Sequence, residues 1–130
     1  MSAHQNNKQQ DEGTASLLTA VQGFLEQDLL PNLQGYDKYQ TRVAINTLKI
    51  AERALRLDPK LKQLDESNLP RFGIAVEDGI AALAEKIADN SVSQSPELLT
   101  YLKQRTLLQM AINSPKYWGY AQAKKNWEAA

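Results

Sequence analysis

The stretch YDKYQTRVAINTLKIAERALRL, residues 36–57, decides the fold. It contains no proline or glycine over about six helical turns, and its apolar residues recur every three or four positions. This spacing is typical of an amphipathic helix whose wide apolar face contacts more than one neighbour. We therefore predict a helix over this stretch that ends at Asp58-Pro59, because proline interrupts the helical hydrogen bonding.

Two further segments show the same periodicity, and hydroxyl side chains precede both of them. Helices are predicted over residues 15–30, capped by Thr14 or Ser16, and over residues 96–113, capped by Ser95. The expected core face of the later helix is Leu98, Leu99, Leu102, Leu108, Met110 and Ile112.

The segment that precedes the polar loop at residues 90–95 contains two glycines, Gly73 and Gly79. Each weakens a helix by roughly 1 kcal/mol relative to alanine. Either they allow close packing against another helix, or they break the segment into two shorter helices. We expect one helix from about Ile74 up to the polar loop at residues 90–95, with a looser segment before it.

The expected fold is all-α, because no useful alternation of apolar and polar residues indicates a strand. We predict an antiparallel bundle of four main helices over residues 14–115, with short connections. Residues 1–13 are polar and are predicted to form a disordered tail. Residues 116–130 form an aromatic extension. In this extension Tyr117 and Trp118 are expected to pack on the bundle, while Trp127 covers a neighbouring subunit or stays loose.

Composition excludes several classes of function. The 15 basic and 15 acidic residues balance, which argues against a dedicated nucleic-acid binder or a polybasic membrane-surface protein. There is no cysteine, no apolar run long enough to span a bilayer and no signal-peptide pattern at the N-terminus. We therefore expect a cytoplasmic protein.

Charge is not evenly spread along the chain. Acidic residues are in excess over 1–34 and 65–97, and basic residues are in excess over 35–64 and 98–130. Either acidic and basic helices lie side by side, or the basic helices leave one face open for an anionic partner.

Three polar side chains lie on or near predicted apolar faces: Arg42, Asn46 and Arg105. A buried arginine needs a charged partner, and Glu26 or Asp28 is the expected one. Either these residues form a polar network that fixes helix register, or the arginines bind a carboxylate or phosphate.

No catalytic set is recognisable, so the chain is predicted not to be an enzyme. The only histidine, His4, lies in the predicted tail. The adjacent carboxylates Asp65-Glu66 and Glu77-Asp78 point about 100° apart on a helix and are assigned to a solvated surface. No phosphate loop, cofactor motif or metal-ligand motif occurs, so no cofactor and no metal is expected.

Two parts of the chain resemble a small bacterial all-helical domain family of unknown function. SLLTAVQGFLEQDLLPNL and YDKYQTRVAINTLKIAERAL are similar to its L-x-x-V-x-x-F-L-E-x-x-L-L-P-x-L and R-V-A-x-N-x-L-x-I-x-x-R-E segments. LLTYLKQRTLLQMAINSPKY is similar to its final leucine-rich helix and N-P-(R/K)-Y motif. The likeness covers residues 16–57 and 74–117.

Four residues match signature positions of that family: Arg42, Asn46, Pro115 and Tyr117. Two departures occur, because Ser114 separates Asn113 from Pro115, and Glu52-Arg53 reverses the usual Arg-Glu order. The family is encoded beside, or fused to, kinases of the aminoglycoside phosphotransferase type, often near acyl-CoA dehydrogenase genes. The resemblance thus implies an accessory role beside a kinase-like enzyme.

The sequence therefore predicts a non-catalytic interaction module for a kinase-like protein partner. The alternatives are a small-ligand protein that holds an acyl or other anionic metabolite between helices, and a structural homodimer. Nucleic acid, membrane and metal are not expected partners. The candidate binding residues are Arg42, Asn46, Arg105, Tyr117 and Trp118.

Overall fold

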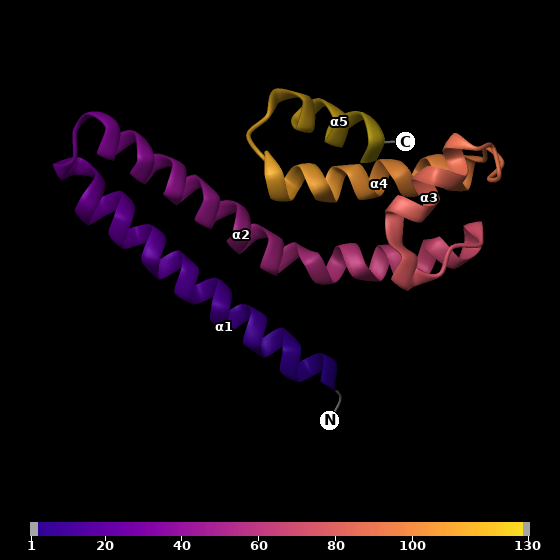
Figure 1. Cartoon of the computed structure of the whole chain (residues 1–130), viewed down its shortest axis with the longest axis horizontal. Helices are drawn as coiled ribbons and strands as arrows, with labels where there is room; N and C mark the ends of the chain where they lie inside the picture. The colour runs from indigo at the N-terminus through magenta and orange to yellow at the C-terminus, as the bar shows by residue number, and fades with distance from the viewer. Residues whose placement is uncertain (1–2, 129–130) are drawn as a thin grey trace. The chain divides into compact units, whose positions relative to one another are not determined.

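The computed structural model describes residues 3–128, and their side chains from residue 7 onward. Within this part the chain is all-helical, with five α-helices, several short π- or 3₁₀-helical turns and no strand (Figure 1). The all-α prediction is confirmed, but a single antiparallel four-helix bundle is not. The chain divides into two compact units, here called the N-terminal unit, up to Leu57, and the C-terminal unit, from Asp58.

The N-terminal unit is a helical hairpin. Helix α1 spans Ala3–Gly23, and the π-helical turn Phe24–Leu29 and the 3₁₀ turn Leu30–Asn32 follow it. The chain then reverses into helix α2, whose first part runs antiparallel to α1 (Figure 1). An ion pair between Lys49 of α2 and Glu26, with Nζ and Oε1 3.3 Å apart, joins the two sides of the hairpin.

Helix α1 begins much earlier than the sequence predicted, and the two expected caps have another role. The hydroxyls of Thr14 and Ser16 donate to the carbonyl oxygens of Gln10 and Glu12, each at 2.9 Å. Such bonds to the residue four positions earlier occur inside helices. The helix therefore continues through most of the stretch that was predicted to be a tail. The side chain of His4 lies outside the described residues.

Helix α2 spans Gly35–Asn68 and contains Pro59, so the prediction that it ends at Asp58-Pro59 is wrong. Proline removes one helical hydrogen bond. The helix nevertheless continues past Pro59, because Leu61 is buried and Leu64 packs on the core of the C-terminal unit. The division between the two units falls immediately before this proline.

The C-terminal unit continues with 3₁₀ turns at Leu69–Phe72 and Val76–Asp78, then helices α3 (Gly79–Ala88), α4 (Pro96–Asn113) and α5 (Trp118–Glu128). The helix predicted from about Ile74 begins only at Gly79, so its predicted start is wrong. Gly73 and Gly79 have φ angles of +73° and +72°, which the interior of a right-handed helix does not allow. A Cβ atom at either glycine would meet open space, so the glycines serve the turns and not close packing.

The buried core lies in the C-terminal unit. Its buried members are Leu69, Ile74, Leu83, Leu98 and Tyr101. The rings of Phe72 and Tyr101 stack with their centroids 6.1 Å apart. The predicted bounds and cap of α4 are confirmed, since the hydroxyl of Ser95 accepts a hydrogen bond from the Leu98 amide. Leu99, however, is exposed instead of being in the core.

Candidate binding site

A polar network connects α2 and α4 inside the C-terminal unit. The guanidinium of Arg105 donates from Nε to Asp65 Oδ1 at 3.1 Å and from Nη2 to Asp65 Oδ2 at 3.4 Å. The hydroxyl of Tyr101 donates to Asp65 Oδ1 as well. The charged side chains are largely buried, at 19% exposure for Arg105 and 17% for Asp65. The expected polar network thus exists at Arg105.

The partner in that network differs from the predicted one. Glu26 and Asp28 were the expected partners, and Asp65 was assigned to a solvated surface, which is wrong. Asp65 lies four residues after Leu61 and four before Leu69, and both leucines are buried. Residues four apart share a helix face, so this spacing was the signal that Asp65 points inward.

The network keeps the hydroxyl of Tyr101 protonated. Burial raises the pKa of this phenol well above its ordinary value, and the hydrogen bond to the Asp65 carboxylate raises the pKa further. Tyr101 therefore acts as a fixed donor. Asp65 receives hydrogen bonds from two side chains on one turn of α4, and in return it fixes the guanidinium of Arg105.

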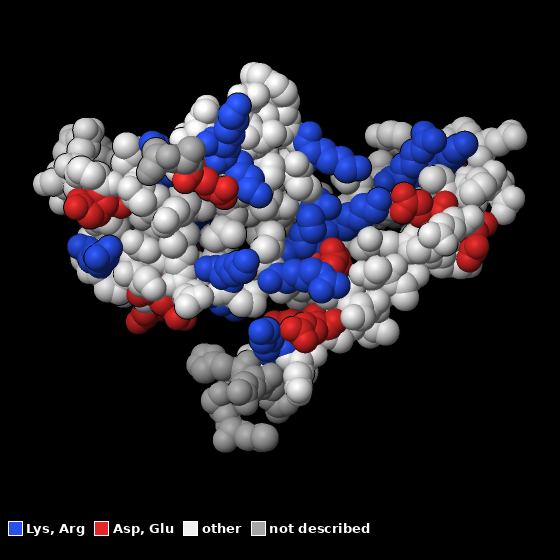
Figure 2. Space-filling model, turned by 180° about the vertical axis from the view of Figure 1, so that it is seen from behind, with Lys and Arg blue, Asp and Glu red and all other residues white. Residues whose placement is uncertain are grey.

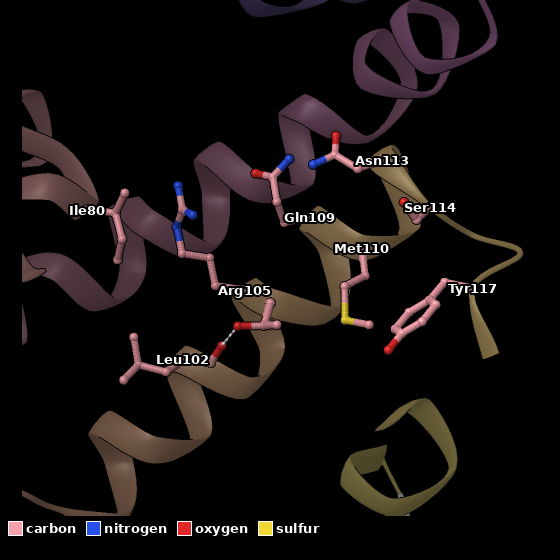
Figure 3. A pocket seen from close by; sticks show the side chains of 9 residues that line it. Ile80, Leu102, Arg105, Gln109, Met110, Asn113, Ser114 and Tyr117 are labelled. Atoms are coloured by element: carbon pink, nitrogen blue, oxygen red, sulfur yellow. Dashed lines mark hydrogen bonds between the residues drawn. The ribbon is translucent and has the colours of Figure 1, made fainter. Parts of the chain in front are cut away.

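A cavity of about 440 Å³ lies over the following turns of α4. Figure 3 shows Arg105, Gln109 and Asn113 along one side of the helix, with Ile80 of α3 at one end and Tyr117 at the other. The remaining lining residues are Leu102, Thr106, Met110 and Ser114. Arg105 is the only charged residue among the nine that line the cavity. This volume lies within the usual range of small-ligand sites.

Tyr117 forms one wall of the cavity, and Gly119 determines where its ring lies. A Cβ atom at position 119 would overlap the Tyr117 ring. Any side chain there would therefore displace the ring. Of the predicted binding residues, the structure brings together Arg105 and Tyr117 in this one cavity.

The other predicted binding residues lie elsewhere. Arg42 and Asn46 are exposed on α2 in the N-terminal unit, so the prediction that Arg42 is buried and paired with Glu26 or Asp28 is wrong. Glu26 instead pairs with Lys49. Trp118 is 74% exposed and Tyr117 is also exposed, while Trp127 is half-buried. The expected packing of the first two aromatic side chains on the bundle is therefore wrong.

The N-terminal unit leaves many large apolar side chains exposed. Leu17, Val21 and Phe24 follow one another at helical spacing and are 69%, 47% and 56% exposed. We call these three residues the α1 row. The first turns of α2 also expose Tyr36, Tyr39 and Val43. The only buried apolar side chains of this unit are Ala15 and Ile45, within the described residues. The three residues belong to the apolar periodicity that predicted an amphipathic helix over residues 15–30.

Basic and acidic side chains lie close together on one face of the protein (Figure 2). On the face seen in Figure 2, Lys and Arg lie next to Asp and Glu. Two ion pairs lie on α2, Arg56 with Glu52 and Lys62 with Asp58. No cluster suited to a metal ion occurs among the described residues. None of the described helices is both long and apolar enough to cross a bilayer.

Comparison with known proteins gives one match. The model of a family described as a domain of unknown function, DUF6285, matches residues 31–117, which is more than half of the chain. The matched segment includes all of α2, α3 and α4, and with them the network and the cavity. No curated protein and no solved structure matches the chain. The chain therefore belongs to the DUF6285 family, whose function is unknown.

Proposed function

We propose that this protein is a non-catalytic interaction module that binds a protein partner through the exposed apolar surface of its N-terminal unit. The α1 row carries the proposal, because Leu17, Val21 and Phe24 are large apolar side chains that stay in contact with solvent. Contiguous exposed apolar surface marks interaction sites in soluble proteins. Aromatic residues such as Phe24 are also enriched in interfaces.

The proposed partner is a kinase-like protein of the aminoglycoside phosphotransferase type. The resemblance of residues 16–57 and 74–117 to a family encoded beside such kinases supports this choice. The α1 row contains no charged residue, so an apolar groove on the partner would match it without burying an unpaired charge. The absence of a catalytic residue set from the sequence supports an accessory role.

The test is co-purification of the chain with a kinase of the aminoglycoside phosphotransferase type from the same organism. We expect a complex at micromolar concentration by size-exclusion chromatography with light scattering. The double variant Leu17→Glu, Val21→Glu should weaken it at least tenfold, because two carboxylates would have to be desolvated at the interface.

The matched control is Leu99→Glu, since Leu99 is similarly exposed but lies on α4 in the C-terminal unit. It should leave the affinity unchanged, and circular dichroism should show that both variants keep their helix content. The proposal fails if no complex forms at micromolar concentration, or if the two variants bind equally well.

The cavity over α4 favours a second candidate, which is binding of a small anionic metabolite. Arg105 and Tyr117 both line it, and the guanidinium supplies a positive group in a site otherwise lined by neutral side chains. Retention of a small acid by protein purified from its own cells, seen by native mass spectrometry, would support this function.

A further inference from the structure

The cavity over α4 has two parallel rows of side chains with different chemistry. Residues four apart on a helix lie on one face and are separated by about 6 Å along the axis. One row is Arg105, Gln109 and Asn113, and it is entirely polar. The other row is Leu102, Thr106 and Met110, in which the Thr106 hydroxyl is already bonded to the Leu102 carbonyl oxygen. A ligand along the cavity meets hydrogen-bonding groups on one side and mostly apolar groups on the other.

The two carboxamides in the polar row are available to a ligand. Gln109 and Asn113 each offer a carbonyl acceptor and an NH₂ donor. Within the described residues, neither side chain makes a hydrogen bond. A carboxamide pairs well with another amide, because each group then donates and accepts.

Arg105 has donors that the network does not use. Its Nε and one hydrogen of Nη2 bind Asp65, which leaves both hydrogens of Nη1 and one of Nη2. Asp65 and Tyr101 hold the guanidinium in place, so less side-chain entropy is lost when a second carboxylate binds it. No acidic residue lines the cavity, but a ligand carboxylate at Arg105 shares the guanidinium with the Asp65 carboxylate.

The spacing of these groups selects a class of ligand. In an extended peptide, groups on the same side repeat every two residues, about 6.6 Å, close to the ~6 Å step between side chains of the polar row. We propose that the cavity binds the carboxyl end of a short extended peptide, with its terminal carboxylate at Arg105 and its amide groups at Gln109 and Asn113. The proposal deepens the second candidate function and does not depend on the α1 row.

The apolar row and Tyr117 contact the opposite side of this peptide. Leu102 and Met110 flank the side chains that point away from the carboxamides, and the Tyr117 ring closes the far end. Because Gly119 leaves room for that ring, Gly119→Ala should displace it and shorten the site.

The experiment is an NMR titration of the full chain with acetyl-Ala-Ala-Ala, its carboxyl-terminal amide, and hexanoate. We expect the free-acid tripeptide to shift the amide resonances of residues 102–117 and to bind at least fivefold more tightly than either other probe. Gln109→Leu should weaken tripeptide binding roughly fivefold through the loss of one amide pair. Asn113→Leu should do the same to acetyl-Ala-Ala-Ala-Ala, because the next amide on that side lies about 13 Å from the carboxylate, beyond the tripeptide. Gln104→Leu, at an exposed glutamine on α4 outside the cavity, is the matched control and should change nothing.

Several results would overturn the proposal. These are no shifts at millimolar tripeptide, equal binding of the tripeptide amide, and equal or tighter binding of hexanoate, which has a carboxylate but no amide. A free peptide and a protein terminus are distinguished by two more probes. Unblocked Ala-Ala-Ala that binds as well as the acetylated form indicates a free peptide, whereas tighter binding of a seven-residue peptide with the same end indicates a protein terminus.

Failure of this proposal can be separated from failure of the interaction module. The kinase complex depends on Leu17 and Val21, whereas the peptide site depends on Gln109 and Asn113. A complex that survives the Gln109 and Asn113 variants while the tripeptide shows no binding overturns only the peptide site.

Discussion

The two units of this chain both contain amphipathic helices, yet they use their apolar residues differently. The C-terminal unit buries Leu69, Leu83 and Tyr101 in a continuous core. The N-terminal unit leaves Leu17 and Phe24 largely exposed. Two antiparallel helices cover only one stripe of each other, whereas the turns and helices of the other unit surround a common centre. The difference shows that helical periodicity identifies apolar faces but does not say whether the same chain covers them.

The largest effect should come from the core of the C-terminal unit. Leu83→Ala is expected to lower the free energy of unfolding by about 2–5 kcal/mol, because Leu83 is fully buried and the substitution leaves a cavity. Leu17→Ala, in the α1 row, should change it by less than about 0.5 kcal/mol.

Denaturant unfolding measures both variants, and two probes separate the units. Both tryptophans, Trp118 and Trp127, lie in α5, so tryptophan fluorescence follows the C-terminal unit while far-ultraviolet circular dichroism follows all helices. Similar losses for Leu83→Ala and Leu17→Ala would contradict the contrast between a closed core and an open apolar surface.

The next effect should come from the network at Arg105. Asp65→Asn is expected to cost about 1–3 kcal/mol, because it leaves the largely buried guanidinium without its charged partner. Asp58→Asn is the matched control on the same helix, since Asp58 pairs with Lys62 at a solvent-exposed position. The control should cost less than about 1 kcal/mol. Equal costs in fluorescence-monitored unfolding would show that burial of the Asp65 pair contributes nothing.

The same network predicts a dependence on alkaline pH. The unfolded Tyr101 phenol loses its proton near its ordinary pKa of 10.0, while the folded phenol has a higher pKa and keeps its proton. The contribution of Tyr101 to stability is therefore complete below pH 10 and falls as the pH rises towards the folded pKa, by at most about 1.4 kcal/mol per pH unit. Tyr101→Phe removes this proton, so the variant should lose less stability than the parent between neutral pH and pH 11. Parallel losses in the two proteins would contradict the raised pKa.

Some of this architecture could be predicted from the sequence, and particular residues show where prediction ended. Ser95-Pro96 specified the start of α4 by local chemistry, and that prediction is confirmed. The prediction that the helix ends at Pro59 was wrong, because the tertiary packing of Leu61 and Leu64 stabilises the helix by more than the proline destabilises it. The strength of that packing cannot be evaluated from the sequence. For Gly73 and Gly79 the sequence allowed either close packing against another helix or a break in the helix. Their positive φ angles support the break.

The candidate site was only partly predictable for the same reason. Arg105 and Tyr117 were identified individually, but their common cavity depends on how α3 and the loop before α5 pack on α4. Asp65 was missed although its spacing from Leu61 and Leu69 placed it on a buried face. Arg42 looked buried because its neighbours in sequence are apolar, yet its side chain is exposed on α2.

The smallest expected effect is at the ion pair of the N-terminal unit. Lys49 and Glu26 lie 3.3 Å apart, with side chains 36% and 50% exposed, so water and salt screen their attraction. A double-mutant cycle of Glu26→Gln and Lys49→Met, followed by circular dichroism, should give a coupling of about 0.2–1 kcal/mol. This coupling should shrink in high salt, since the Debye length falls from about 10 Å at 0.1 M to about 3 Å at 1 M. A coupling as large as that of Asp65 with Arg105 would mean that the hairpin is held together by charge. Binding of a protein partner would then no longer be the explanation for the exposed apolar side chains of the α1 row.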